Sequence, residues 1–408
     1  MKNLVNRIIK TSLIMRIVIG LAVGIILGIV CPGIAIISLL GQVFLGALKS
    51  IAPILVFVLV ISSLANAGSG IGKRFRTVII LYLSSTILAA LVAVIASRIF
   101  PVTILLTGTN ASGTAPEGIG EILNSIALSM VSNPIKALAD GNYMGILTWS
   151  VIFGLALKNI ASDATKQVFQ HLSDAVSLAV KWIINLAPVG IMGIVYDSTS
   201  QSGVGIFANY GRLVALIIGC IFVFVLVVDP LIVAVCLRKN PYPLVFRCIK
   251  ESAITAFFTR SSAANIPIDM ALCEKLGLDR DMYSVSIPLG ATINMDGAAI
   301  TITVMALAVA NTVGVQVDFP TSVMLSVVAA LGACGTSGVA GGSLLLIPMA
   351  CSLFGVGSDI AMQAVGVGFI IGVIQDSLET AVNSSGDVLF TATAEFMEWK
   401  KQGKEIKF

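Results

Sequence analysis

The stretch AMQAVGVGFIIGVIQDSLETAVNSSGD, residues 361–387, joins an apolar run to three carboxylates. A charged side chain inside a membrane is costly, and it persists where it faces a bundle interior or a water-filled cavity. At 100° per residue, four polar side chains fall within about 60° of one another on a helix, with Glu379 on their flank. These four are Asp376, Thr380, Asn383 and Asp387. A helix end emerging into water would explain Asp387 but not Asp376, so the stretch predicts a spanning helix with a polar stripe facing a bundle interior.

The composition places the whole chain in a membrane. Hydrophobic residues make up 57% of its 408 residues, charged residues only 11%, and the mean hydropathy is +1.00. Soluble domains carry roughly 25% charged residues, so the chain is expected to be an all-α polytopic membrane protein. The net charge of +4 gives no reason to expect a nucleic-acid partner.

Apolar runs long enough to span a membrane occur about eight times. They cover residues 13–31, 35–65, 76–100, 142–160, 172–196, 209–237, 283–311 and 358–383. Two further apolar segments, 244–275 and 321–356, are interrupted by FFTRSSAANIP and GACGTSGVAGGS. Each predicts two short helical arms around a polar tip, which is tolerated at membrane depth only where protein buries it or it lines a cavity.

Charge predicts the orientation of these segments. Lysine and arginine cluster before the first span, after the second, fourth and sixth spans, and at the C-terminal end. In contrast, Lys136 is the only lysine or arginine in residues 103–138. The positive-inside rule therefore places both termini in the cytoplasm and requires the two re-entrant hairpins to enter from opposite sides. A hairpin followed by a span then occurs twice in opposite senses, an inverted repeat typical of secondary transporters.

Two blocks carry candidate binding groups. In TRSSAANIP, residues 259–267, Arg260 lies at a hairpin tip, and Ser261, Ser262 and the free N–H groups of a helix start could bind a carboxylate. An ordinary arginine in a cytoplasmic loop is the alternative. In PLGATINMDGAAITI, residues 288–302, Asn294 and Asp296 lie among glycines that allow the helix to unwind. Exposed carbonyls and side-chain oxygens suit a hard cation, although a packed polar kink would also explain the glycines.

Two weaker candidates are the glycine-rich tip GTSGVAGGS, residues 335–343, and the hydroxyl run LYLSST with Tyr82, Ser85 and Thr86. The tip could be a gate or a plain flexible loop. The hydroxyls could complete an ion site, but helix packing is the favoured interpretation from the residues alone. We find no nucleophile beside a histidine base and no cluster of metal ligands, so an enzyme is not expected.

The blocks TRSS, PLGATINMDG, GTSGV and the N-x-x-G-D ending at 383–387 resemble, in order and spacing, the dicarboxylate/amino acid:cation symporter family. The resemblance covers nearly the whole chain. It implies an elevator-type sodium symporter that forms homotrimers in the lipid bilayer of a bacterial inner membrane and needs no cofactor. Residues 1–240 would form a six-helix region of scaffold and outer transport helices, 241–395 the transport-domain core, and 396–408 a cytoplasmic tail.

The resemblance also implies the binding residues. The substrate would meet Ser261, Ser262, Val339, Gly341, Asp376, Glu379, Thr380 and Asn383, with Asp376 on the α-ammonium group. One sodium site would use Gly290, Asn294, Asn383 and Asp387. A second would use Thr292, Met295, Ala333 and Thr336. A third would use Tyr82, Ser85, Thr86, Asn294 and Asp296.

Glu379 departs from the pattern of acidic-substrate members, which place an arginine there to pair with the substrate's side-chain carboxylate. Glu379 would repel that group in a low dielectric. A small neutral amino acid, serine or threonine, is therefore the expected substrate, with a hydroxyl donating to Glu379. Alternatively, Glu379 pairs with Arg260 and does not touch substrate. A sodium- or proton-coupled symporter of glutamate, aspartate or dicarboxylates with the same fold is the alternative function.

Overall fold

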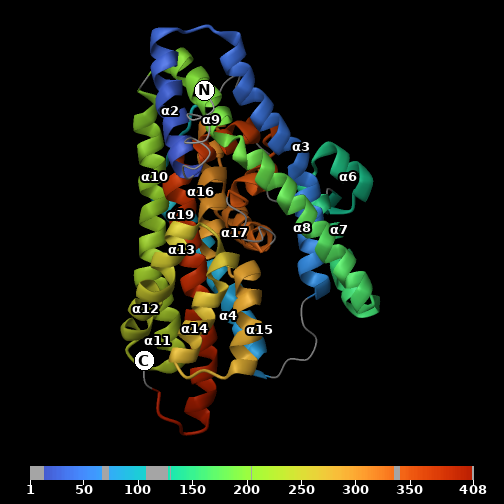
Figure 1. Cartoon of the computed structure of the whole chain (residues 1–408), viewed down its shortest axis with the longest axis vertical. Coiled ribbons are helices and arrows are strands. Elements are labelled where there is room, and N and C mark those ends of the chain that lie inside the picture. The colour runs from blue at the N-terminus through green and yellow to red at the C-terminus, as the bar shows by residue number, and fades with distance from the viewer. Residues whose placement is uncertain are drawn as a thin grey trace, which may run out of the picture.

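The computed structural model describes residues 13–66, 73–106, 127–128, 130–203, 205–334 and 341–406. All regular elements within these ranges are helical (Figure 1). The first half contains α2 (Leu13–Val30), α3 (Ala35–Asn66), α4 (Lys73–Ile99), α6 (Pro134–Asp140), α7 (Tyr143–Ile160), α8 (Asp163–Asn185), α9 (Ala187–Ser202), α10 (Ile206–Val223), the π-helical η1 (Phe224–Val228) and α11 (Asp229–Leu237). The second half contains α12 (Tyr242–Cys248), the π-helical η2 (Ile249–Ala253), α13 (Ile254–Thr259), α14 (Ser262–Lys275), α15 (Arg280–Ile293), α16 (Asp296–Val313), α17 (Phe319–Ala333), the 3₁₀ turn η3 (Ser343–Leu346), α18 (Ile347–Ser352) and α19 (Ser358–Lys401).

Each of the eight predicted spans falls on helix, and six of them fall on stretches long and apolar enough to cross a membrane. Within the described ranges, five helical stretches are long and apolar enough to cross a membrane, and a sixth is the bent pair α8–α9. The five are Ala35–Asn66, Arg74–Ile99, Ala208–Leu237, Arg280–Val313 and Ser358–Lys401. The predicted spans at 13–31 and 142–160 appear as the shorter apolar helices Met15–Val30 and Gly145–Ile160. The chain is thus a polytopic membrane protein, and its described residues include five or six clear spans together with shorter apolar helices.

The predicted span 172–196 is not one straight helix. Helices α8 and α9 meet at 53°, and α9 begins with Pro188 in its first turn. A proline has no N–H to donate to the preceding turn and its ring crowds that turn, which ends α8. The bend lets α9 run beside α2 while α8 lies with α7 on the outer arm at the right of Figure 1.

Small residues bring α2 and α9 into close contact. Gly20, Gly24 and Gly28 recur every four residues along α2 and face the backbone of α9. A Cβ added to Gly24 would lie 2.6 Å from the carbonyl oxygen of Met192, closer than real Cβ atoms approach. Such a glycine stripe permits the tight backbone packing by which helices associate in membranes.

The first interrupted segment forms two arms. α12, η2 and α13 make one arm and α14 makes the other, with the break at Arg260 and Ser261. Arg260 ends α13 in the left-handed conformation with φ 51°, which non-glycine residues seldom adopt. The second segment has α17 as one arm and η3 with α18 as the other, and residues 335–340 of its tip lie outside the described ranges. These arms match the predicted pattern; whether they are re-entrant in a membrane stays a prediction.

Helix α19 runs through the middle of the molecule and packs against both interrupted segments, α4, α15 and α16 (Figure 1). Its first half, as far as Val382, joins the larger apolar core. Its second half, from Val388, joins a smaller core with α11, α12, α14 and α15. The polar residues 383–387 therefore lie where the two apolar cores meet.

Candidate functional site

The broken helix α15–α16 supplies one side of the site. α15 ends at Ile293, and Asn294 and Met295 leave the helical conformation with ψ of 82° and 53° before α16 begins at Asp296. This confirms the helix break predicted from the glycine-rich block. The break turns backbone carbonyls and the side chains of Asn294 and Asp296 into the interior, where both side chains are fully buried.

Asp296 faces hydroxyl groups from α4. Its Oδ1 accepts hydrogen bonds from Ser85 Oγ and Thr86 Oγ1, each at 2.9 Å. Ser85 Oγ also lies 3.1 Å from Asn294 Oδ1. Asp296 Oδ2 is buried and has no hydrogen-bond partner. The hydroxyl run on α4, for which packing was the favoured interpretation, therefore meets the buried carboxylate.

Asp387 forms a second oxygen-rich centre on α19. Its Oδ1 accepts from Asn294 Nδ2 at 3.1 Å, and the same amide donates to the carbonyl of Asn383 at 3.2 Å. Tyr82 donates to the backbone carbonyl of Asp387 at 3.0 Å. A Cβ added to Gly290 would lie 2.6 Å from Asp387 Oδ1, so only glycine leaves the carboxylate its place. Asp387 Oδ2 is buried without a hydrogen-bond partner.

The residues predicted for another sodium site lie near the same break. Met295 and Ala333 are buried, and Cys334 Sγ lies 3.3 Å from the carbonyl oxygen of Ile293. The end of α17 is thus held against the unwound turn. The Thr292 hydroxyl donates to the carbonyl of Leu289 in its own helix at 2.7 Å. Thr336, the remaining member of this set, lies outside the described residues.

The buried carboxylates of Asp296 and Asp387 have no cationic partner among the described residues. No lysine, arginine or histidine of the described ranges forms an ion pair with Asp296 or Asp387. Burying an uncompensated carboxylate costs several kcal/mol. Carboxylate, amide and backbone oxygens are the ligands of a hard cation, so the two unpartnered carboxylate oxygens fit the sodium sites expected there.

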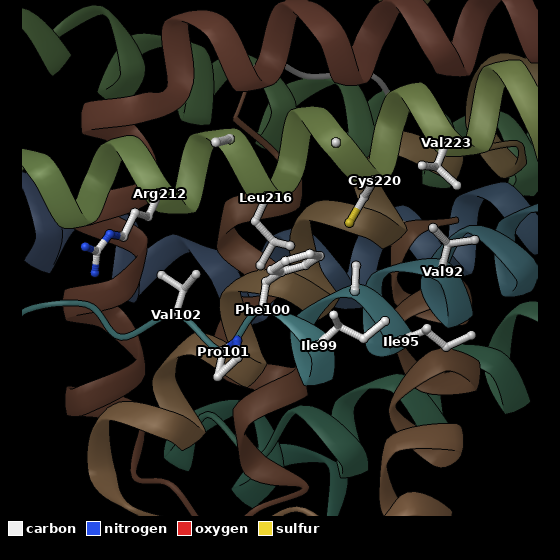
Figure 2. Close-up of a pocket in the computed structure, with 13 residues that line it drawn as sticks. Val92, Ile95, Ile99, Phe100, Pro101, Val102, Arg212, Leu216, Cys220 and Val223 are labelled. Carbon is white, nitrogen blue, oxygen red and sulfur yellow. The ribbon is translucent and has the colours of Figure 1, made fainter.

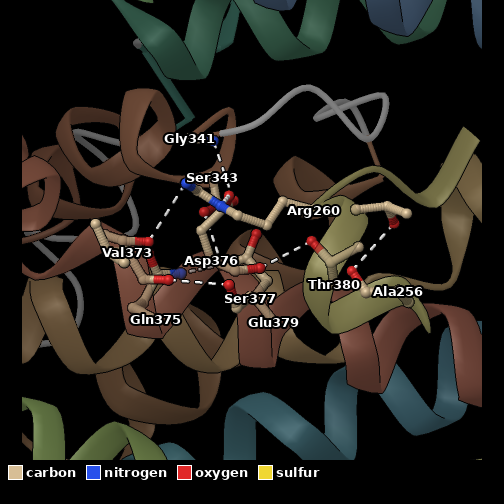
Figure 3. A network of polar contacts seen from close by, with 12 residues as sticks. Ala256, Arg260, Gly341, Ser343, Val373, Gln375, Asp376, Ser377, Glu379 and Thr380 are labelled. Carbon is tan, nitrogen blue, oxygen red and sulfur yellow. Dashed lines mark hydrogen bonds and ion pairs between the residues drawn. The ribbon is translucent and has the colours of Figure 1, made fainter. Parts of the chain in front are cut away.

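Asp376 holds the tips of both interrupted segments (Figure 3). Its Oδ2 accepts from Arg260 Nε at 2.6 Å, and its Oδ1 accepts from the backbone N–H of Gly341 at 3.1 Å. Arg260 also donates to the carbonyl of Gly372 at 3.4 Å. The carboxylate is almost completely buried and the guanidinium mostly so. Two tips from separate segments therefore meet at one side chain of α19.

Glu379 lies in a pocket of neutral donors, one turn further along α19. Its Oε2 accepts from Ser343 at 2.8 Å and also from Gln375 (Figure 3). The same oxygen accepts from the Thr301 hydroxyl at 2.9 Å. The alternative prediction that Arg260 pairs with Glu379 is wrong, because the guanidinium pairs with Asp376. Glu379 thus lies beside the Asp376–Arg260 pair with only hydroxyl and amide partners.

The remaining predicted substrate residues differ in how free their groups are. Ser261 Oγ caps α14 by accepting from the N–H of Ala264 at 3.2 Å, and Thr380 donates to the Asp376 carbonyl at 2.8 Å. Asn383 Oδ1 accepts from the N–H of Gly297 at 2.8 Å, while its Nδ2 meets only the weak acceptor Met295 Sδ. The Asn383 amide is therefore available to a better acceptor. Ser262 is buried at the start of α14, and Val339 lies outside the described residues.

The residues that surround Glu379 are not predicted from the sequence. Thr301 and Ser343 belong to blocks singled out above, but their spacing does not indicate that both would reach one carboxylate. Gln375 precedes Glu379 by four residues, and this helical spacing was the one usable signal. A second missed group is the buried cluster inside the first hairpin, where Asn265 donates to Ser252 and Asp269 at 3.1 and 3.0 Å.

Comparison with known proteins finds relatives that cover nearly the whole chain. The sequence matches the model of the sodium:dicarboxylate symporter family over residues 13–396. A protein from Bifidobacterium adolescentis named serine/threonine transporter SstT is 58% identical over 395 residues, covering 97% of this chain and 92% of that relative. Proteins of the same name from Streptococcus agalactiae and Streptococcus thermophilus are 58% and 55% identical, covering 97% and 98% of this chain and 98% and 100% of the relatives. The resemblance drawn from the four sequence blocks is confirmed.

Proposed function

The chain belongs to the sodium:dicarboxylate symporter family, and we propose from this premise that it imports serine and threonine, each transport cycle coupled to inward movement of sodium. It is a transporter rather than an enzyme. The observation that carries the choice of substrate is the neighbourhood of Asp376 and Glu379, two buried carboxylates one turn apart on α19. One has a cationic partner and the other has only hydroxyl and amide donors.

A small neutral amino acid matches these groups. Its ammonium replaces the Arg260 guanidinium on Asp376, and its carboxylate takes the Asn383 amide and the free N–H groups at the start of α14. Its hydroxyl donates to Glu379 in place of one of the present donors. An acidic substrate would instead bring a second carboxylate against Glu379, a repulsion that the low dielectric of a buried site strengthens. Once its guanidinium leaves Asp376, Arg260 remains near enough to pair with the substrate carboxylate.

Sodium supplies the charge that the other two carboxylates lack. We assign one ion to Asp387 with Asn294 and the carbonyls of Gly290 and Asn383. A second ion uses Asp296, Asn294, Ser85, Thr86 and Tyr82. A third uses backbone oxygens at Thr292 and Met295 with the end of α17. The support for the first two is the same in each case: a fully buried carboxylate with one unpartnered oxygen.

The family premise also suggests how the cycle moves. Residues 241–395 would form the core that carries substrate across the membrane, residues 1–240 would contribute the trimeric scaffold and outer helices, and 396–408 would be a cytoplasmic tail. Both termini would face the cytoplasm of a bacterial inner membrane, because Lys and Arg cluster before the first span, after the second, fourth and sixth spans, and at the C-terminal end. Both tips would act as gates, since each is held by Asp376 in the structure.

Uptake into proteoliposomes tests the proposal. Labelled L-serine should accumulate with an inward sodium gradient, and replacing external sodium by choline should abolish that accumulation. Excess unlabelled threonine should compete, whereas excess aspartate should not. Equal uptake with and without sodium would overturn the coupling, and competition by aspartate equal to that by serine would favour the acidic-substrate alternative.

A charge reversal tests the role of Glu379. Glu379→Arg should lower serine uptake about tenfold or more, because it removes the hydroxyl acceptor, and it should make aspartate a competitor. Glu398→Arg is the matched control, since Glu398 lies on the same helix near its end and pairs with Lys401. Unchanged serine uptake and unchanged aspartate competition in Glu379→Arg would place Glu379 outside the substrate pocket.

A further inference from the structure

An apolar groove runs between α4 and α10, away from the substrate and sodium residues. The cavity has a volume of about 840 Å³, and its lining includes Ile95, Ile99 and Phe100 on the α4 side and Arg212, Gly219 and Val223 on the α10 side. Arg212 is the one charged lining residue. Figure 2 shows Arg212 at one end of the row of labelled side chains and Val223 at the other.

The groove opens toward the surface of the described structure. On its α4 side, more than half of the surface is exposed in each of Ile95 (54%), Ile99 (63%) and Phe100 (64%). On its α10 side, Val223 is nearly half exposed. Both α4 and the α10–α11 stretch are long and apolar enough to span a membrane. In a bilayer, an open apolar groove on spanning helices faces lipid.

Arg212 gives the groove a polar end. Among the described residues Arg212 has no ion pair and no hydrogen-bond partner. Arg98, in the last turn of α4, does have protein partners: it donates to the carbonyl oxygen of Val317 and to Ser322 Oγ, both at 2.7 Å. An exposed arginine without a protein partner presents a planar donor fork that matches a phosphate group.

The length of the groove matches one leaflet. Arg212 and Val223 are eleven residues apart on α10, about 16 Å along a helix. The hydrocarbon region of a bilayer is about 30 Å thick, so one leaflet contributes about 15 Å. α10 follows the loop YDSTSQSGVGIF, which lacks Lys and Arg, and α11 leads into Arg238 and Lys239, so the positive-inside rule places Arg212 in the outer half.

We propose that the groove between α4 and α10 binds one anionic phospholipid of the outer leaflet, with its phosphate on Arg212 and one acyl chain along the apolar floor to Val223. A lipid supplies both the anion and the chain of matching length. Because α4 also carries Ser85 and Thr86, the bound lipid lies on the same helix as a proposed sodium site.

Two substitutions separate the head group from the chain. Arg212→Gln removes the charge and keeps a polar side chain. Gly219→Leu fills the groove, and an added Cβ at Gly219 meets no atom within 4 Å, so the helix can accept it. Gly46→Leu on α3 is the matched control, since Gly46 is exposed and equally open. Lys136→Gln is the control for loss of an exposed cation on the predicted outer side.

The experiment uses the full-length protein in detergent, titrated with phosphatidylglycerol or phosphatidylcholine, with bound lipids counted by native mass spectrometry. The unsubstituted chain should retain one phosphatidylglycerol per protomer at low lipid. Arg212→Gln should weaken phosphatidylglycerol binding about tenfold, since a charge-assisted hydrogen bond to its phosphate is lost. It should weaken phosphatidylcholine binding less, because the choline cation already offsets the phosphate charge of that lipid. Gly219→Leu should weaken both lipids, and the two controls should bind as the unsubstituted chain does.

Three results would overturn the proposal. Lipid retention by Gly219→Leu equal to that of Gly46→Leu would mean that the bound lipids lie elsewhere. If Arg212→Gln bound phosphatidylglycerol as tightly as the unsubstituted chain does, Arg212 would have no role in binding the head group. A change of oligomeric state in Gly219→Leu with unchanged lipid counts would make this face a contact between copies.

Discussion

Asp376 is the side chain on which the substrate proposal depends most. It ties the tip of the first hairpin through Arg260 and the second through Gly341. An ion pair buried to this degree stabilises the folded state only if both partners remain satisfied, and removal of one partner is strongly unfavourable. Substrate binding therefore has to exchange one cation for another on Asp376, never leaving it bare.

The substitution Asp376→Asn tests this exchange. It keeps the shape of the side chain but removes the charge that holds the ammonium group, and loss of a buried charge partner costs at least about 2 kcal/mol. Serine affinity, measured by a binding titration in saturating sodium, should fall at least about 30-fold. Ser377→Ala is the control, because the Ser377 hydroxyl donates to Val373 of its own helix at 2.9 Å. Affinity within threefold of the unsubstituted protein would refute the assigned role.

At the scale of elements, the contact between α2 and α9 depends on residues without side chains. Gly20, Gly24 and Gly28 let the two backbones meet along one stripe, and Gly41 of α3 meets Gly193 of α9 in the same way. α9 is thereby held between α2 and α3 by close backbone contact. The seam depends on volume rather than polarity, so even a small apolar side chain should disrupt it.

We expect Gly24→Val to destabilise the folded chain by about 1–3 kcal/mol, the usual cost of overpacking. The added Cβ would lie 2.6 Å from a backbone oxygen that cannot move without shifting α9. Thermal unfolding in detergent, with Gly46→Val as the control, measures the effect. Equal unfolding temperatures for the two variants would show that α2 and α9 are not packed as described.

The elements could be predicted from sequence where the signal is local. Apolar length predicts the helices, and glycine beside Asn294 and Asp296 predicts the break between α15 and α16, because glycine and polar side chains both permit an unwound turn. The bend between α8 and α9 carried a local signal in Pro188, but the apolar run continues across it and hid the change of direction.

The pairing of side chains could not be predicted in the same way. Arg260 and Asp376 are 116 residues apart, and nothing near either residue distinguishes Asp376 from Glu379 as the partner of the arginine. The choice depends on how the left-handed end of α13 directs the chain at Arg260. Two of the donors on Glu379, Thr301 and Ser343, come from other helical elements and likewise depend on the assembled fold.

At the scale of the whole molecule, sodium should act as a stabilising ligand. An ion that binds the folded state alone adds about 2.7 kcal/mol at one hundred times its dissociation constant. The unfolding temperature in detergent should therefore rise with sodium chloride and stay unchanged with choline chloride at the same ionic strength. Asp387→Asn should reduce the shift, since that carboxylate loses its charge. Equal stabilisation by the two salts would argue against specific sodium sites.

One further consequence comes from the length of α19. Its 44 residues form an uninterrupted helix about 66 Å long, roughly twice the thickness of the hydrocarbon layer. Asp376 lies about 37 Å from the C-terminal end of this rod, so a tilt of one degree about that point displaces the far end by about 0.6 Å. A rigid tilt of the helix about Asp376 would therefore be magnified at its C-terminal end. A spectroscopic label at Lys400 would report it without touching a single binding residue.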